Sequence, residues 1–257
     1  MKKIKKILSK KNKSKIVCLT AYSKNVAEVV DKHADIVLVG DSLGSVLYNY
    51  STTRKVTLTE MINHSKSVRM GVKKSLMVVD MPYKTYSTKN LALKNAKKII
   101  KETKCDAVKL EGGKKIIKQI TYLIKNKIPV MGHLGLLPQS IKGSFKSKGK
   151  NTKEINDLLN DALLLQKKGV FAIVLECVKT AVSKKITQNL KIPTIGIGSS
   201  INCDGQVLVT DDLIGLNETN IKFVKKFFNI RKFLNLGIKR FASEVRSKKY
   251  PTKKYSY

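Results

Sequence analysis

The chain has 257 residues, of which 52 are lysine or arginine and 18 are aspartate or glutamate, giving a formal net charge of +34. This length suffices for one large domain with a substantial core, and no apolar run approaches the ~18–20 residues that cross a bilayer. The first residues are basic but lack the apolar stretch and cleavage site of a secretory signal. We therefore expect a soluble cytoplasmic protein without a membrane partner.

The positive charge raises the question of a nucleic-acid-binding protein. Only five of the basic residues are arginine, although arginine is the side chain best suited to phosphates and base edges. The lysines are spread along the whole chain and do not form one stripe or tail. We therefore expect no specific nucleic-acid partner, only salt-sensitive binding to polyanions, and keep a basic nucleic-acid-binding protein as an alternative.

Short, nearly continuous apolar runs recur along the chain, as in strands buried on both faces. Eight strands are predicted, at Ile16–Thr20, Ile36–Gly40, Leu76–Asp80, Ala107–Leu110, Pro129–Gly132, Phe171–Glu176, Pro193–Ile197 and Val207–Thr210. Helices are predicted between them at Lys24–Lys32, Leu58–Met70, Lys89–Thr103, Lys114–Asn126, Lys153–Lys168 and Ala181–Asn189. A short N-terminal helix around Ile4 and Ile7 and a helical tail from Phe223 complete the prediction.

Alternating strands and helices indicate a parallel sheet, and eight repeats favour its closure into a (β/α)8 TIM barrel. An open doubly wound sheet is the alternative fold. No internal linker is evident, so we predict one catalytic domain over residues 1–257. Two connections, Leu43–Val56 and Gly135–Asn151, are longer than the repeat requires, and loops of such length are commonly binding loops or lids.

Polar side chains gather where the predicted strands end, which is the face of a barrel that carries the active site. Four of the 18 acidic residues lie there, together with one lysine and one histidine. These residues are Asp41, Asp80, Glu111, Glu176, Lys109 and His133. Carboxylates at such positions also cap helices, but their number on one rim favours a functional site.

Oxygen ligands without a cysteine or histidine partner are typical of Mg²⁺. Asp41 and Asp80, from neighbouring strands, are the predicted ligand pair, and Glu111 is expected to bind directly or to hold a metal-bound water. The four cysteines form no C-x-x-C pair and are expected to be reduced and mostly buried. A tight turn or an anion site is expected at Gly196–Ser200 after the seventh strand.

One motif is also typical of a different class of enzyme, the serine hydrolases. Gly40-Asp41-Ser42-Leu43-Gly44 has the G-x-S-x-G form of a serine-hydrolase nucleophile elbow. That chemistry needs a histidine late in the chain, and the last histidine here is His133. A serine hydrolase therefore remains only as an alternative that depends on His133.

A series of short motifs runs in order nearly from end to end. They are Thr20-Ala21-Tyr22, Leu38–Gly44, Asp80-Met81-Pro82, Val108–Gly113, Gly132–Leu136, Pro138-Gln139-Ser140, Leu175-Glu176-Cys177, Ile192–Gly198 and Asp204-Gly205-Gln206. Together, in this order and spacing, they resemble the ketopantoate hydroxymethyltransferase family. The resemblance implies a (β/α)8 barrel, Mg²⁺, a homo-oligomer that is commonly decameric, and transfer of a hydroxymethyl group from 5,10-methylenetetrahydrofolate to 3-methyl-2-oxobutanoate. The product is 2-dehydropantoate (ketopantoate), in the first step of pantothenate and coenzyme A biosynthesis.

Residue by residue, the resemblance implies that Asp41 and Asp80 bind the metal and that Glu111 holds a metal-bound water. It assigns Ser42, Asp41, Asp80, Lys109 and His133 to the substrate, and Glu176 to general base catalysis. A different 2-oxo-acid lyase on a similar barrel is the remaining enzymatic alternative. The chain departs from the family pattern at Thr53–Val56, Gly143–Lys150 and Gly198-Ser199-Ser200, which concerns the folate side and the lid more than the chemistry.

Overall fold

The computed structural model describes residues 1–140, 146–218 and 220–257. The chain folds into two compact units, Met1–Val209 and Thr210–Tyr257. The first unit contains every residue predicted for the active site. None of the described helices has the length and apolar character needed to cross a membrane.

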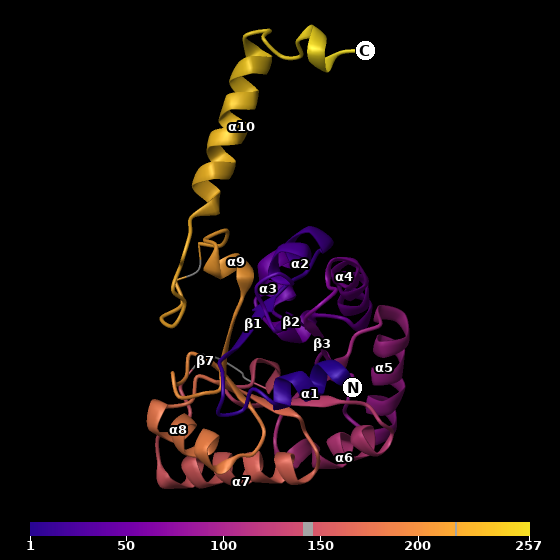
Figure 1. The fold of residues 1–257 in the computed structure, drawn as a ribbon, viewed down its shortest axis with the longest axis vertical. Helices are drawn as coiled ribbons and strands as arrows, with labels where there is room; N and C mark the ends of the chain where they lie inside the picture. Colours follow the sequence, from indigo (N-terminus) through magenta and orange to yellow (C-terminus); the bar gives the residue numbers. More distant parts are fainter. Residues whose placement is uncertain (141–145, 219) are drawn as a thin grey trace. The chain divides into compact units, whose positions relative to one another are not determined.

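Eight parallel strands close into a barrel in the first unit, in the order β1 to β8, with β8 pairing back to β1 (Figure 1). The strands are β1 Ile16–Thr20, β2 Ile36–Val39, β3 Leu76–Asp80, β4 Ala107–Glu111, β5 Val130–Gly135, β6 Ala172–Glu176, β7 Thr194–Ile197 and β8 Gly205–Leu208. The predicted (β/α)8 barrel is confirmed, and the open sheet is excluded because both edge strands are paired to each other.

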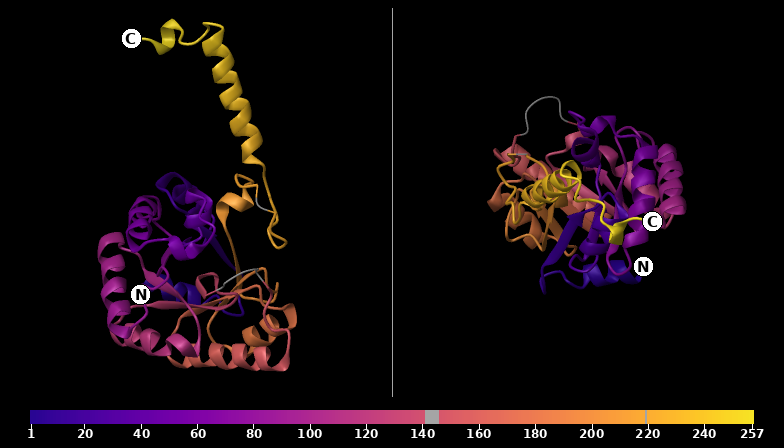
Figure 2. Two further views of the ribbon diagram at one scale, coloured as in Figure 1. Left: turned by 180° about the vertical axis from the view of Figure 1, so that it is seen from behind. Right: turned by 90° about the horizontal axis from the view of Figure 1, so that it is seen from above.

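Helices follow the strands around the outside of the barrel, as Figures 1 and 2 show from three sides. They are α2 Lys24–Val30, α3 Leu43–Tyr48, α4 Leu58–Gly71, α5 Lys89–Thr103, α6 Ile117–Lys125, α7 Thr152–Lys167 and α8 Thr180–Asn189. Short 3₁₀ turns lie at η1 Thr53–Lys55, η2 Lys114–Ile116 and η3 Pro138–Ser140. Residues 198–204, between β7 and β8, form turns without a helix.

Most predicted boundaries are right within two or three residues, and the exceptions have local causes. The connection Leu43–Val56, predicted as a loop, contains α3 and η1. Its apolar residues Leu43 and Val56 are buried, so this segment packs as structure in spite of its polar composition. β8 begins at Gly205, two residues earlier than predicted, where it pairs with Ile16 of β1. Gly205 lies so close to Ile16 that a side chain would collide with that backbone.

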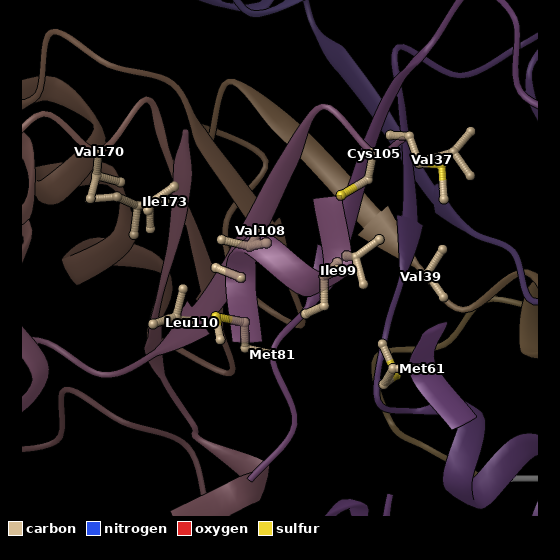
Figure 3. Close-up of a cluster of buried hydrophobic side chains, with 14 of the residues drawn as sticks. Val37, Val39, Met61, Met81, Ile99, Cys105, Val108, Leu110, Val170 and Ile173 are labelled. Carbon is tan, nitrogen blue, oxygen red and sulfur yellow. The ribbon is translucent and has the colours of Figure 1, made fainter. Parts of the chain in front are cut away.

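Two apolar layers hold the barrel together. The side chains on the outer face of the strands pack against the surrounding helices, and Figure 3 shows part of this layer, including Val37, Val39, Met61, Val108 and Ile173. The alternate side chains point inward and form a second cluster, which includes Ile36, Leu38, Leu76, Val78 and Val207. Strands buried on both faces explain why the sequence reads as continuous apolar runs.

The N-terminal helix α1 Lys2–Leu8 closes one end of the barrel. Ile4 and Ile7 are buried and belong to the inner apolar cluster. Lys3 Nζ donates to Ser75 O at 2.8 Å, immediately before β3 begins. Lys11 Nζ lies 2.8 Å from Asp204 Oδ2, immediately before β8. Both contacts are at the amino ends of strands, so α1 covers the end of the barrel opposite the polar strand ends.

The C-terminal unit contains α9 Thr210–Leu213, α10 Ile230–Arg246 and η4 Lys253–Tyr255. A helical tail was predicted from Phe223, but the long helix begins only at Ile230, where Asn229 caps it by accepting from Lys232 N. Helix α10 has no buried residue. Its exposed apolar side chains are Phe233, Leu234, Leu236, Ile238, Phe241 and Val245.

Candidate active site

The polar residues at the strand ends continue the inner face of the barrel. Along β3, Leu76, Val78 and Asp80 alternate with outward side chains, so the carboxylate of Asp80 points to the same interior as the two apolar residues. The register of neighbouring strands then fixes the pairs: Asp80 is opposite Lys109, and Glu111 is opposite His133. The carboxyl end of the barrel is therefore lined with charge, while its amino end is apolar.

Asp41 and Asp80 are both buried and adjacent. The backbone N–H of Asp41 donates to Asp80 Oδ2 at 3.1 Å, which ties the end of β3 to the turn after β2. Ser42, the next residue, pairs with the hydroxyl of Tyr22 at 2.8 Å. Asp41, Ser42 and Asp80 therefore lie together where β2 and β3 end.

Lys109 connects the aspartates to a histidine. Its ammonium nitrogen lies 3.2 Å from Asp80 Oδ1 and 3.2 Å from His133 Nδ1. Because an ammonium group only donates, Nδ1 has to be the accepting nitrogen of a neutral imidazole, and the ring proton resides on Nε2.

His133 in turn lies between two glutamates. His133 Nδ1 is 3.5 Å from Glu111 Oε1, and His133 Nε2 is 3.2 Å from Glu176 Oε2. In spite of this short distance, Nε2 has no hydrogen-bond partner among the described residues. Glu176 is the more open carboxylate, with 16% of its side chain exposed, against 2% for Glu111.

Burial governs the protonation of this cluster. It raises the pKa of Asp80 to about 7, with Lys109 opposing the rise and Asp41 adding to it. Burial also raises the pKa of Asp41 and of Glu111 in the cation-free protein, again against the opposing effect of Lys109. For Lys109 burial acts to lower the pKa, but the surrounding carboxylates outweigh it and raise the pKa. Burial and the Lys109 charge lower the pKa of His133, which agrees with a neutral ring.

Gln139 lies at the centre of the site, although its place in the sequence predicts no role for it. Gln139, in η3, is 2% exposed. Its backbone N–H donates to Glu111 Oε2 at 3.0 Å, and its Nε2 donates to Asp41 Oδ2 at 2.8 Å. The hydroxyl of Tyr86 donates to Gln139 Oε1 at 2.5 Å. Gln139 belonged to a recognised motif, but no periodicity or charge distinguished it from an ordinary turn residue.

The serine-hydrolase alternative has no geometric support. Ser42 Oγ is paired with Tyr22, and His133 is surrounded by Lys109, Glu111 and Glu176. Within the described part of the chain, Ser42 and a histidine are therefore not joined as nucleophile and base.

The turn after β7 is stabilised by its own serine hydroxyl groups. Ser199 Oγ pairs with Ser183 Oγ at 2.5 Å, and Ser200 Oγ accepts from Asn202 N at 3.1 Å. These hydroxyls serve the turn itself, which favours the tight turn over the anion site.

In the connection Gly135–Asn151, residues 141–145 lie outside the described residues, and with them Gly143, Ser144 and Phe145 of the expected lid.

The residues present fit a hard divalent cation. Asp41, Asp80 and Glu111 are three buried carboxyl groups, and among the described residues the ammonium group of Lys109 is the one cation that faces them. Asp80 Oδ1 has no hydrogen bond from the described residues. No three histidine, cysteine or acidic side chains of those residues converge into a preformed cage. Mg²⁺ takes one or two carboxylates from a protein and fills the rest of its shell with water and substrate, so two adjacent aspartates, Asp41 and Asp80, fit its needs.

Comparison with known proteins identifies relatives of the whole chain. A family profile described as ketopantoate hydroxymethyltransferase matches residues 1–253. A protein of Pelagibacter ubique (strain HTCC1062), named 3-methyl-2-oxobutanoate hydroxymethyltransferase, is 63% identical over 256 residues, covering 100% of this chain and 99% of the relative. Relatives of the same name are 44% identical over 256 residues in Rhizobium etli, covering 98% and 94%, and 46% identical over 254 residues in Acetivibrio thermocellus, covering 97% and 90%.

Solved structures share the fold at low identity. A phosphoenolpyruvate phosphomutase of Streptomyces platensis has a TM-score of 0.64 at 10% identity, covering 96% of this chain and 87% of that one. A 2,3-dimethylmalate lyase has a TM-score of 0.61 at 10% identity, covering 99% and 92%. These likenesses support the barrel alone. The full-length profile and the relatives show that the chain is a transferase and that it belongs to the ketopantoate hydroxymethyltransferase family.

Proposed function

We propose that this barrel transfers a hydroxymethyl group from 5,10-methylenetetrahydrofolate to 3-methyl-2-oxobutanoate, giving 2-dehydropantoate, in an Mg²⁺-dependent reaction through an enolate. The observation that carries the proposal is the row of polar and charged side chains at the carboxyl end of the barrel. It runs from Asp80 through Lys109 and His133 to Glu176, in steps of 3.2 Å. The family and its relatives supply the identity of the reaction.

Asp41 and Asp80 are the residues that would hold Mg²⁺, with Glu111 acting directly or through a water. When bound, the metal supplies Lewis-acid stabilisation of negative charge on the oxo acid. Its double positive charge would also oppose the burial that raises the pKa of Asp41, Asp80 and Glu111, and so favour their ionised forms.

Lys109 is proposed to neutralise charge on the oxo acid. It is buried, and nearby carboxylates raise its pKa, so it stays cationic at neutral pH. Ser42 and His133 are proposed as substrate contacts together with Asp41 and Asp80. Neutral His133 carries its proton on Nε2, where it can donate a hydrogen bond without adding a second positive charge to the site.

Glu176 is proposed to remove the C3 proton of 3-methyl-2-oxobutanoate. It is the last residue of β6 and its side chain is more open than that of Glu111, so it can meet a substrate that enters the barrel mouth. The proton moves to a Glu176 carboxylate oxygen, and the resulting carbanion, delocalised onto the keto oxygen, forms the new C–C bond to the one-carbon group of the folate. Both C–N bonds of that carbon break, one water molecule supplies the hydroxyl group of the product, and tetrahydrofolate leaves.

The protein is proposed to be a cytoplasmic biosynthetic enzyme with small-molecule substrates, one catalytic domain and no specific nucleic-acid partner. It forms a homo-oligomer, a decamer by resemblance to the family, and the exposed apolar side chains of α10 support burial of this helix in an assembly. Light scattering of the purified chain measures the subunit number.

A product assay tests the function. Purified protein is incubated with 3-methyl-2-oxobutanoate and 5,10-methylenetetrahydrofolate, with and without EDTA, and 2-dehydropantoate is measured by mass spectrometry. We expect product that disappears with EDTA and returns with excess Mg²⁺. Product from another 2-oxo acid at a higher rate would instead identify a different specificity, and activity unaffected by EDTA would contradict the metal.

A further inference from the structure

The side-chain amide of Gln139 lies between one hydroxyl and two acceptors. Nε2 donates to Asp41 Oδ2 at 2.8 Å and to Met81 O at 3.0 Å. Oε1 accepts from the hydroxyl of Tyr86 at 2.5 Å. Gln139 and Tyr86 are 2% and 8% exposed, so water does not compete freely for these bonds.

This arrangement permits only one orientation of the amide. A carboxylate oxygen and a peptide carbonyl only accept, so the NH₂ group has to face Asp41 and Met81. A reversed amide would place its oxygen against both acceptors. The hydroxyl of Tyr86 then has to donate to Oε1, and the direction of the chain Tyr86, Gln139, Asp41 is set.

Gln139 also contacts a second acidic residue of the site, Glu111. The Gln139 backbone N–H donates to Glu111 Oε2 at 3.0 Å, while its side chain reaches the turn after β2 and the residue after β3. Three strand ends are thus joined through one residue of η3. Oδ2 of Asp41 is engaged by Gln139, and Oδ1 has no hydrogen bond from the described residues.

We propose that Gln139, oriented by Tyr86, is a positioning residue that holds the Asp41 carboxylate in its metal-binding orientation, with Oδ2 held by the amide and Oδ1 left for a divalent cation. The inference rests on the metal half of the proposed function. Groups that orient a ligating carboxylate raise metal affinity because the carboxylate need not be ordered at the moment of binding.

The test is Mn²⁺ binding, followed by EPR of the free ion, in full-length protein without substrates. Gln139→Met keeps the length of the side chain and removes its amide, and we expect about a 10- to 100-fold weaker Kd. Tyr86→Phe removes only the hydroxyl, and we expect a loss of about 2- to 10-fold, as for one hydrogen bond. Because Tyr86 acts through Gln139, Tyr86→Phe should add nothing in the Gln139→Met background.

Gln166→Met is the matched control. Gln166 Oε1 accepts from Lys191 N at 2.5 Å and from Ile192 N at 3.2 Å, before β7 at the amino end of the barrel. The same substitution there should lower the melting temperature and leave the Mn²⁺ Kd unchanged. An equal loss of Mn²⁺ affinity in Gln166→Met would indicate general loosening and overturn the proposal.

The remaining outcomes are also decisive. Native near-UV circular dichroism with an unchanged Kd in Gln139→Met overturns the proposal. If Gln139→Met does not fold, Tyr86→Phe is used in its place, and native circular dichroism with an unchanged Mn²⁺ Kd in that variant overturns the proposal. A wild-type chain that binds no Mn²⁺ overturns both this inference and the metal half of the proposed function, whereas wild-type binding with an unaffected Gln139→Met overturns the inference alone. In steady-state assays of Gln139→Met, the Mg²⁺ concentration that gives the half-maximal rate should rise by a larger factor than kcat falls, relative to the wild type.

Discussion

His133 Nδ1 lies 3.2 Å from Lys109 Nζ. The lysine can only donate, so the imidazole is neutral and protonated on Nε2, and burial together with the Lys109 charge lowers its pKa. We expect ¹⁵N NMR of histidine-labelled protein to show one ring in the Nε2–H tautomer throughout pH 6–8. The chain has only three histidines, and loss of this signal in His133→Gln assigns it. A doubly protonated ring at pH 7 would contradict the assignment.

Glu176→Gln should abolish a partial reaction that needs no folate. If Glu176 is the base, the variant should exchange the C3 proton of 3-methyl-2-oxobutanoate with D₂O about 10²- to 10⁴-fold more slowly than the wild type. Proton NMR of the substrate measures this rate. Glu102→Gln is the control, since Glu102 pairs with Lys66 on the outside of the barrel at 2.7 Å and should exchange at the wild-type rate. Unchanged exchange in Glu176→Gln would exclude Glu176 as the base.

Gly135→Ala should damage stability and activity together. Gly135 ends β5 with φ of +97°, and a Cβ there would collide with the carbonyl oxygen of Glu176 and lie 2.6 Å from Val178 Cγ2. We expect a destabilisation of roughly 2 kcal/mol or more and a lower kcat, because the backbone that carries Glu176 has to move.

The contrasting glycine is Gly237 in α10, where an added Cβ meets nothing within 4 Å. Gly237→Ala should stabilise the helix by about 0.5–1 kcal/mol. Chemical denaturation and a steady-state assay of both variants provide the comparison. Wild-type activity in Gly135→Ala would show that the close approach to Glu176 is not needed for function.

Asp31 gives a pH-dependent contribution to stability. Burial acts to raise its pKa, but hydrogen bonds from the backbone N–H groups of Ser75, Lys74 and Lys73 outweigh this and lower the pKa to about 2. A carboxyl group whose pKa is depressed on folding stabilises above its unfolded pKa of 3.8 and loses this contribution as the pH falls toward 2.

Asp31→Asn should therefore lower the free energy of unfolding by about 1 kcal/mol at pH 7, since solvent screening reduces the value expected from the pKa shift alone. The difference from wild type should shrink below pH ~4, as measured by urea denaturation at several pH values. Asp157→Asn, at an exposed position on α7, serves as control and should change stability little. A difference between Asp31→Asn and wild type that does not depend on pH would contradict the hydrogen-bond explanation.

The sequence predicted the barrel because its strands are buried on both faces and its helices have one apolar side. It also located the acidic residues of the site, since Asp80 and Glu176 each directly end an apolar run that is predicted to be a strand. It did not predict Gln139, because the role of this residue depends on a turn that reaches across three strands. The helix in Leu43–Val56 was missed for a similar reason: its burial is decided by tertiary contacts and not by its polar composition.

The position of α1 has a consequence for the order of folding. Its residues Ile4 and Ile7 precede every strand of the barrel in the chain, yet their binding site is complete only when β8, which ends at Leu208, pairs with β1. Domains that emerge N-terminus first expose such segments during synthesis. The apolar face of this helix therefore lacks its binding site until β8 has been synthesised, and a chaperone can bind the exposed helix during that time.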